Sequence, residues 1–126
     1  IDTISLDAHW RTLYLRHPLD RPTDGASIPS LLKFDARQVE GTTVWLEREF
    51  DLPMQDGCVN YLLQVDAVPV GTHLRLNGRD FGELTEALSI DVTDMVALED
   101  NEIAFRVSHN AAGAFGGVRL VAVPCD

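Results

Sequence analysis

The stretch Thr72–Gly82, THLRLNGRDFG, contains the strongest indication of the fold. Leu74 and Leu76 alternate with polar residues, so one side of an extended chain would be apolar and the other polar. The dipeptide Asn77-Gly78 follows, and it favours a type I′ turn because both central residues of that turn need a positive φ. The stretch therefore predicts a β-hairpin, with the returning strand over Arg79–Gly82.

The same alternation with a period of two recurs along the rest of the chain. Apolar side chains alternate or dominate in five further segments, which are Thr43–Leu52, Asn60–Val68, Leu88–Val92, Asn101–Val107 and Val118–Val123. Shorter strands are expected over Trp10–Leu15 and Ala26–Leu32, and one helical turn over Thr93–Asp100. About eight strands separated by turn signals predict a single all-β domain over residues 1–126, an antiparallel β-sandwich or jelly roll.

The charge of the chain excludes two classes of partner. The 126 residues include 20 Asp and Glu against 10 Lys and Arg, which gives a net charge of -10. Nucleic acids and anionic membranes are bound through clusters of basic residues, which this composition does not favour. No apolar run is long enough to span a bilayer. The segment Ile1–Trp10 lacks the apolar centre of a signal peptide, which favours a cytoplasmic location without fixing it.

The two cysteines, Cys58 and Cys125, do not by themselves define a role. Small domains held together by disulfides have a higher density of cysteine, so we expect two free thiols. A bridge between them is the alternative, because the sequence does not give the distance between their Cα atoms. Two cysteines with scattered histidines also do not form a zinc-binding pattern.

The residues that carry enzymatic chemistry do not form a recognisable set. A metal site on a jelly roll would need two histidines one residue apart on a strand, and the nearest approach is His73-Leu74-Arg75. Glu47 and Glu49 share one strand face, whereas glycosidic chemistry needs two carboxylates facing each other across the substrate. We interpret them as a solvated acidic face. No nucleophile motif is present, so we do not expect an enzyme.

Aromatic and planar polar side chains supply candidates for a ligand site. Phe34, Phe81 and Phe115 lie beside expected loops, where a ring could stack on a sugar, and the alternative is that they belong to the core. Polar groups on strand faces or at the turn could bind hydroxyls or carboxylates, and these are Arg75, Asn77, Arg106 and Arg119. Their alternative role is an outer sheet face with surface ion pairs.

Six segments, taken in order, form a recognisable pattern. They are SLDAHWRTLYL (5–15), VWLEREFDLP (44–53), THLRLNGRDFG (72–82), IDVTDMV (90–96), DNEIAFRV (100–107) and GGVRLVAV (116–123). Together they resemble the N-terminal sugar-binding domain of family 2 glycoside hydrolases, the β-galactosidase and β-glucuronidase group. The resemblance extends over Leu6–Val123 and implies a galactose-binding-like β-sandwich.

Two departures from the family pattern bear on function. Where the family carries a Gly-Gly-Tyr stretch near the substrate, residues 83–89 read ELTEALS, and Ala8 replaces an opening glycine. The catalytic carboxylates of the family lie in a separate barrel domain, and a (β/α)₈ barrel needs roughly 250 residues, more than this chain has. The resemblance therefore implies a non-catalytic accessory domain associated with carbohydrate.

We expect such a domain to bind sugar through loops at one end of the sandwich, with an aromatic ring stacked on the sugar. The candidate ligand-binding residues are Arg75, Asn77, Phe81, Glu83, Asn110 and Phe115. No cofactor is expected, although domains of this class often hold a structural calcium ion, for which the sequence names no ligands. The alternative is a structural module that packs against a catalytic glycoside hydrolase domain or forms a homodimer, and binds no sugar.

Overall fold

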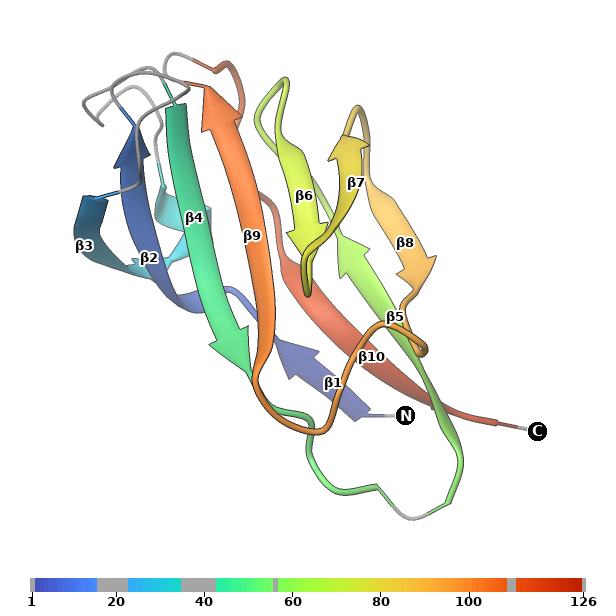
Figure 1. The fold of residues 1–126 in the computed structure, drawn as a ribbon. Helices are drawn as coiled ribbons and strands as arrows, with labels where there is room; N and C mark the ends of the chain where they lie inside the picture. Colours follow the sequence, from blue (N-terminus) through green and yellow to red (C-terminus); the bar gives the residue numbers. More distant parts are fainter. Residues whose placement is uncertain (1, 16–22, 35–42, 56, 109–110, 126) are drawn as a thin grey trace.

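The computed structural model describes residues 2–15, 23–34, 43–55, 57–108 and 111–125, which form two antiparallel sheets stacked face to face (Figure 1). The smaller sheet has four strands, in the order β1 (Asp2–Ser5), β10 (Val118–Pro124), β5 (Val59–Val65) and β8 (Leu88–Asp91). The larger sheet has six strands, in the order β3 (Thr23–Ser30), β2 (Ala8–Leu15), β4 (Thr43–Phe50), β9 (Asn101–Ser108), β6 (His73–Leu76) and β7 (Arg79–Glu83). A short 3₁₀ helix, η1 (Leu31–Lys33), follows β3.

This arrangement confirms the all-β sandwich predicted from the sequence. The described residues contain ten strands rather than about eight. The strand that the sequence did not predict is β1, which has only four residues and adds to the edge of the smaller sheet beside β10. In the described part of the chain, no helix is long and apolar enough to cross a membrane.

Side chains at alternate strand positions fill the space between the sheets. In β4, Val44 and Leu46 are fully buried, whereas Trp45 and Glu47 remain partly exposed on the other face. Successive side chains of a strand point to opposite faces, so the period of two in the sequence gives one apolar face per sheet. The two apolar faces meet and form the core.

Four aromatic rings form a continuous cluster in this core. Trp10 contacts Phe105 with ring centroids 5.4 Å apart, Phe105 contacts Phe115 at 5.0 Å, and Phe115 contacts Phe34 at 6.0 Å. The buried indole N–H of Trp10 donates to the carbonyl of Leu6, which satisfies the one polar atom of that side chain. Phe34 and Phe115 are only 8% and 3% exposed, so both belong to the core.

The hairpin predicted at Asn77 and Gly78 connects β6 and β7. The φ angles of these residues are 49° and 81°, and two positive values are what a type I′ turn requires. On its other side β6 pairs with β9 in antiparallel register, with Leu76 opposite Ile103. The hairpin therefore joins the larger sheet at one edge and places its turn next to the start of β9.

The two cysteines form a disulfide, so the expectation of two free thiols is wrong. The Cα atoms of Cys58 and Cys125 are 5.3 Å apart, and the amide of Cys125 donates to the carbonyl of Cys58 at 3.0 Å. The register of β10 on β5 pairs Pro124 with Val59, which brings the cysteines side by side. This register joins residues 67 positions apart, and the spacing of the cysteines does not reveal it.

The helical turn expected over Thr93–Asp100 is wrong as well. This segment is an irregular loop with one hydrogen-bonded turn, in which the amide of Met95 donates to the carbonyl of Val92 at 2.8 Å. The buried side chain of Asn101 bonds both backbone groups of Ala97, at 2.7 Å to its N–H and 2.8 Å to its carbonyl. Groups that a helix would pair internally are therefore bonded to a side chain instead.

Candidate functional site

The outer face of the larger sheet brings charged side chains from three neighbouring strands together. Arg11 of β2 is paired with Glu47 of β4, and Glu49 of β4 is paired with Glu102 of β9. Glu47 and Glu49 are two positions apart on one strand, so both project from the same face. Glu49 is exposed, as predicted for a solvated acidic face, whereas Glu47 is half-buried, and Glu102 adds a third carboxylate to this face.

Trp45, on the same face of β4, is flanked by two arginines. Its ring centroid lies 5.1 Å from Cζ of Arg75 and 5.8 Å from Cζ of Arg106. A guanidinium over an indole ring is attracted by the negative face of the ring. Both arginines were sequence candidates for contacts with a sugar, and in the structure each has a partner within the protein.

A hollow of about 500 Å³ lies beside these residues. Its lining consists of His9, Arg11, Glu47, Arg48, Glu49 and Glu102. Burial raises the pKa of Glu47, the nearby Glu102 raises it further, and Arg11 opposes the shift. The side chain of Arg48 is fixed against β2, because its Nη1 donates to the carbonyl of Ala8 at 2.7 Å.

The lining of the hollow can bind polar groups, but its carboxylates are not arranged as in a glycosidase. Guanidinium donors and carboxylate acceptors suit hydroxyl groups of a ligand. Glu47, Glu49 and Glu102 come from one face of two adjacent strands, whereas glycosidic cleavage needs carboxylates on either side of the bond. The described residues contain no group of three or more His, Cys, Asp or Glu that could hold a metal. A structural calcium ion stays a prediction.

The remaining sequence candidates have different surroundings. Phe115 lies in the core, and Phe81 of β7 is half-buried against the same core. Glu83 is exposed at the end of β7, where a Cβ at Gly71 would lie 3.6 Å from its carboxylate. Asn110 lies outside the described residues.

The candidates do not gather at one end of the sandwich. The loop 111–117 runs along residues 66–70, where the amide of Val70 donates to the carbonyl of Ala112 at 2.8 Å. A Cβ at Gly116 would lie 2.9 Å from the amide nitrogen of Ala67, which explains the need for glycine there. Asn77, in the β6–β7 turn, lies at the opposite end (Figure 1).

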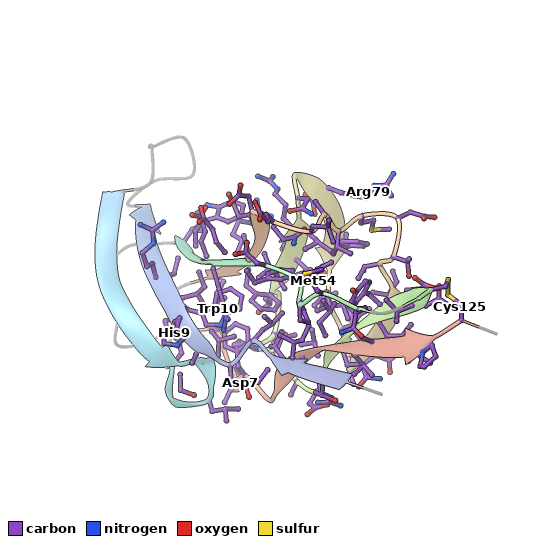
Figure 2. The ribbon with its side chains drawn as sticks, turned by 90° about the horizontal axis from the view of Figure 1, so that it is seen from below. Asp7, His9, Trp10, Met54, Arg79 and Cys125 are labelled. Carbon is purple, nitrogen blue, oxygen red and sulfur yellow. A yellow bond between two sulfur atoms is a disulfide. The ribbon has the colours of Figure 1, made fainter. Side chains whose placement is uncertain are left out.

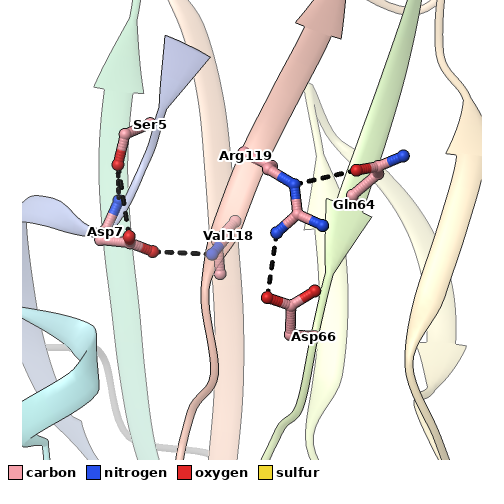
Figure 3. Close-up of polar contacts among 6 residues, drawn as sticks. All are labelled: Ser5, Asp7, Gln64, Asp66, Val118 and Arg119. Carbon is pink, nitrogen blue, oxygen red and sulfur yellow. Dashed lines mark hydrogen bonds and ion pairs between the residues drawn. The ribbon is translucent and has the colours of Figure 1, made fainter. Parts of the chain in front are cut away.

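Arg119 lies on the smaller sheet and is held by neighbouring side chains (Figure 3). Its Nε donates to Gln64 at 2.9 Å, and its Nη1 forms an ion pair with Asp66 at 2.9 Å. The bond from Arg119 lowers the pKa of Asp66. Nearby, the carboxylate of Asp7 accepts a bond of 2.7 Å from the amide of Val118. These contacts give Arg119 the surface ion pair that the sequence left as its alternative role.

Sequence reasoning did not single out four residues of the hollow, namely His9, Arg11, Arg48 and Glu102. Arg11 and Glu102 reach it only through the register of β2 and β9 on β4. His9 has a φ of 65°, an uncommon conformation outside glycine. The alternation of charged residues along β4 was the one signal of this face that the sequence carried.

Solved structures provide the comparison that places this fold, since no family model and no curated protein sequence matches the chain. A β-glucuronidase from Bacteroides uniformis matches 98% of this chain with a TM-score of 0.70 and 19% identity, over 18% of that protein. A Bifidobacterium dentium β-glucuronidase complexed with coumarin-3-O-glucuronide matches 99% of this chain with a TM-score of 0.67 and 16% identity, over 30% of that protein. A family 2 glycoside hydrolase from Bacteroides cellulosilyticus matches 98% of this chain with a TM-score of 0.64 and 19% identity, over 21% of that protein. The chain has the fold of a domain of these family 2 enzymes.

The expectation drawn from the six sequence segments is thereby confirmed for the fold. The domain spans 18% to 30% of the length of these three proteins, so most of each has no counterpart in it. At such low identities the likeness concerns architecture, and one architecture serves many functions. The activity of this domain has to be argued from its own residues.

Proposed function

We propose that the chain is a non-catalytic accessory domain of a larger carbohydrate-active protein, in which it packs against the part that carries catalysis. The main support for this proposal is the contrast between the share of this chain that is matched and the share of each larger protein that it covers. The matches include 98% or more of this chain but only 18% to 30% of the proteins that it matches. A domain that occupies such a fraction of a larger enzyme has the rest of that enzyme as its natural partner.

The chemistry of the described residues supports a packing role over catalysis. The carboxylates of the charged face project in one direction, and the raised pKa of Glu47 has its causes in burial and in Glu102. No aromatic side chain whose burial is described is more than partly exposed, and Trp45 is flanked by Arg75 and Arg106. None of these rings is exposed enough for a sugar to stack on it.

Carbohydrate recognition is the second candidate, and the hollow beside Glu47 favours it. Its carboxylates and guanidiniums could bond the hydroxyls of a sugar without a stacking ring. A glycan array with the purified chain, with and without calcium, tests this role. Binding that is lost in Glu47→Gln and kept in Gln64→Ala, on the other sheet, would place recognition in the hollow. If no glycan on the array is bound, carbohydrate recognition by the chain alone is ruled out and the packing role is favoured.

Two measurements test the packing role. An antibody raised against the chain should detect, in the source organism, a polypeptide several times heavier than 13.9 kDa. The purified chain alone should not hydrolyse aryl β-glucuronides or β-galactosides. A native product of the size of this chain, or hydrolysis by the chain alone that is lost in Glu47→Gln, would overturn the proposal.

A further inference from the structure

Two loops at one end of the sandwich are bonded into a single surface (Figure 1). Residues 51–55 follow β4, and residues 93–100 precede β9. The amide of Leu52 donates to the carbonyl of Leu98 at 2.9 Å, and the amide of Asp100 donates to Oδ1 of Asp51 at 2.9 Å. We call these two segments together the distal surface.

Two large apolar side chains project from the distal surface. Met54 is 97% exposed and Leu98 is 72% exposed, whereas Met95 and Val96 pack partly against the core. Figure 2 views the molecule from this end and shows Met54 in the middle of the field. The backbone hydrogen bond from Leu52 to Leu98 holds the two segments that carry these side chains next to each other. Exposed apolar side chains that are rimmed by polar residues are a feature of interaction sites.

The distal surface is preorganised by two asparagines. The side chain of Asn101 is fully buried and bonds both backbone groups of Ala97, next to Leu98. The Nδ2 of Asn77 donates to the carbonyl of Met95 at 2.7 Å. A loop held in one conformation loses little conformational entropy when it binds, which favours docking. The β6–β7 turn thus acts as a support for the neighbouring loop.

The charged side chains of the two segments all have one sign. The distal surface carries four exposed carboxylates, which are those of Asp51, Asp94, Glu99 and Asp100. Its two segments contain no Lys, Arg or His. An apolar centre with a charged rim is the usual anatomy of a protein interface, and an acidic rim is complemented by basic groups of the partner.

From this complementarity we propose that the distal surface is the docking face of the domain, and that it binds a protein surface with an apolar pocket ringed by Lys and Arg. The partner is the remainder of the parent polypeptide, so the inference rests on the proposed function. A second copy of the chain fits poorly, because a symmetric contact would set four carboxylates against four. Met54 and Leu98 enter the pocket, and the carboxylates pair with its basic rim.

Oxidation of Met54 by dilute peroxide, followed by mass spectrometry, tests the proposal. In the chain alone, Met54 should oxidise rapidly, and in the parent polypeptide about tenfold more slowly, because access governs methionine oxidation. Met95 lies on the same surface but is half-buried, so it should oxidise more slowly than Met54 in the chain alone. Equal rates for Met54 in both would overturn this inference and leave the proposed function standing. Absence of any larger polypeptide would overturn the proposed function itself, and the inference with it.

Two matched variants give a second readout that does not depend on oxidation. Leu98→Gln should lower the Tm of the parent polypeptide by several degrees more than that of the chain alone. Val70→Gln is the control, since Val70 is 71% exposed at the other end of the sandwich. Equal shifts for Leu98→Gln in both proteins contradict docking through this surface. Protection of Met54 that grows with the concentration of the chain alone would assign the surface to self-association and overturn the proposal.

Discussion

Asn77 and Asn101 lie side by side, and Nδ2 of Asn77 donates to Oδ1 of Asn101 at 3.0 Å although 24 positions separate them in the chain. Oδ1 of Asn77 also accepts a bond of 2.8 Å from the amide of Glu102. The hairpin turn and the start of β9 are therefore fastened to each other by side chains as well as by strand pairing. Asn77, a candidate sugar ligand from the sequence, uses its amide group for this purpose.

Replacement of Asn101 by alanine should destabilise the domain strongly. The variant removes a fully buried side chain that bonds the carbonyl of Phe50 and both backbone groups of Ala97. We expect a loss of about 3 kcal/mol in the free energy of unfolding, measured in urea. Ser108→Ala, at an exposed position of the same strand, is the control and should change it by less than about 0.5 kcal/mol. Similar losses in both variants would contradict the role given to Asn101.

The disulfide should contribute a large share of the stability. Cys58 and Cys125 close a loop with a sequence separation of 67, and constraint of the unfolded chain by such a loop is worth about 4 kcal/mol. The double variant C58S/C125S should lose this amount in urea denaturation. Dithiothreitol should produce the same loss in the natural chain and none in the double variant. Thiol labelling of the protein taken from its own cells should find no free cysteine, and labelling of both would contradict the bridge.

Phe115→Ala should act on stability rather than on a ligand. The ring of Phe115 contacts those of Phe34 and Phe105 in the core, and loss of such a ring costs about 3 to 5 kcal/mol. Phe81→Ala, at a half-buried position, is the comparison and should cost less. Thermal unfolding of both variants provides the measurement. A Phe115→Ala variant with unchanged Tm would show that the ring is not part of the core.

Glu47→Gln should stabilise the domain at neutral pH. Burial raises the pKa of Glu47, so the folded chain holds this proton more tightly than the unfolded chain does. This group therefore lowers the free energy of unfolding as the pH rises from the unfolded pKa through the raised folded pKa. The variant should match the natural chain at low pH and exceed it above that range. Urea denaturation across the acidic range measures the difference, and equal stability of the two proteins at every pH would contradict this assignment.

Asp66→Asn should have the opposite effect and destabilise the domain at neutral pH. The bond from Arg119 lowers the pKa of Asp66, so this carboxylate stabilises the folded chain above its unfolded pKa. That contribution is lost as the pH falls through the lowered folded pKa. The variant should be less stable than the natural chain at neutral pH and equally stable at low pH. The difference in stability should be small, because both partners of the ion pair are exposed. A constant difference at all pH values would contradict this assignment.

The sequence predicted those features that neighbouring residues determine. The turn at Asn77 and Gly78 was predictable because a type I′ turn depends on the φ preferences of its own two residues. The buried positions of β4 followed from alternation along a single strand. The order of six short segments was enough to predict the architecture that the solved structures confirm.

Features that depend on pairing between distant strands could not be predicted in the same way. The disulfide follows from the register of β10 on β5, and the carboxylate of Glu102 joins those of Glu47 and Glu49 through the register of β9 on β4. The helical turn was predicted for Thr93–Asp100 because its residues favour one locally, but Asn101 binds the backbone there. Glycines around Phe115 suggested an exposed loop, although its ring completes an aromatic cluster.

The bond between Cys58 and Cys125 also determines how the domain responds to mechanical load. β10 lies between β1 and β5, and the disulfide joins the residue that follows β10 to the residue that precedes β5. A pull on the C-terminal end is thus transmitted to two strands of the smaller sheet at once, instead of peeling β10 away one hydrogen bond at a time. We expect the sheet to resist tension by shear, so that the force needed to extend the domain drops when the disulfide is reduced.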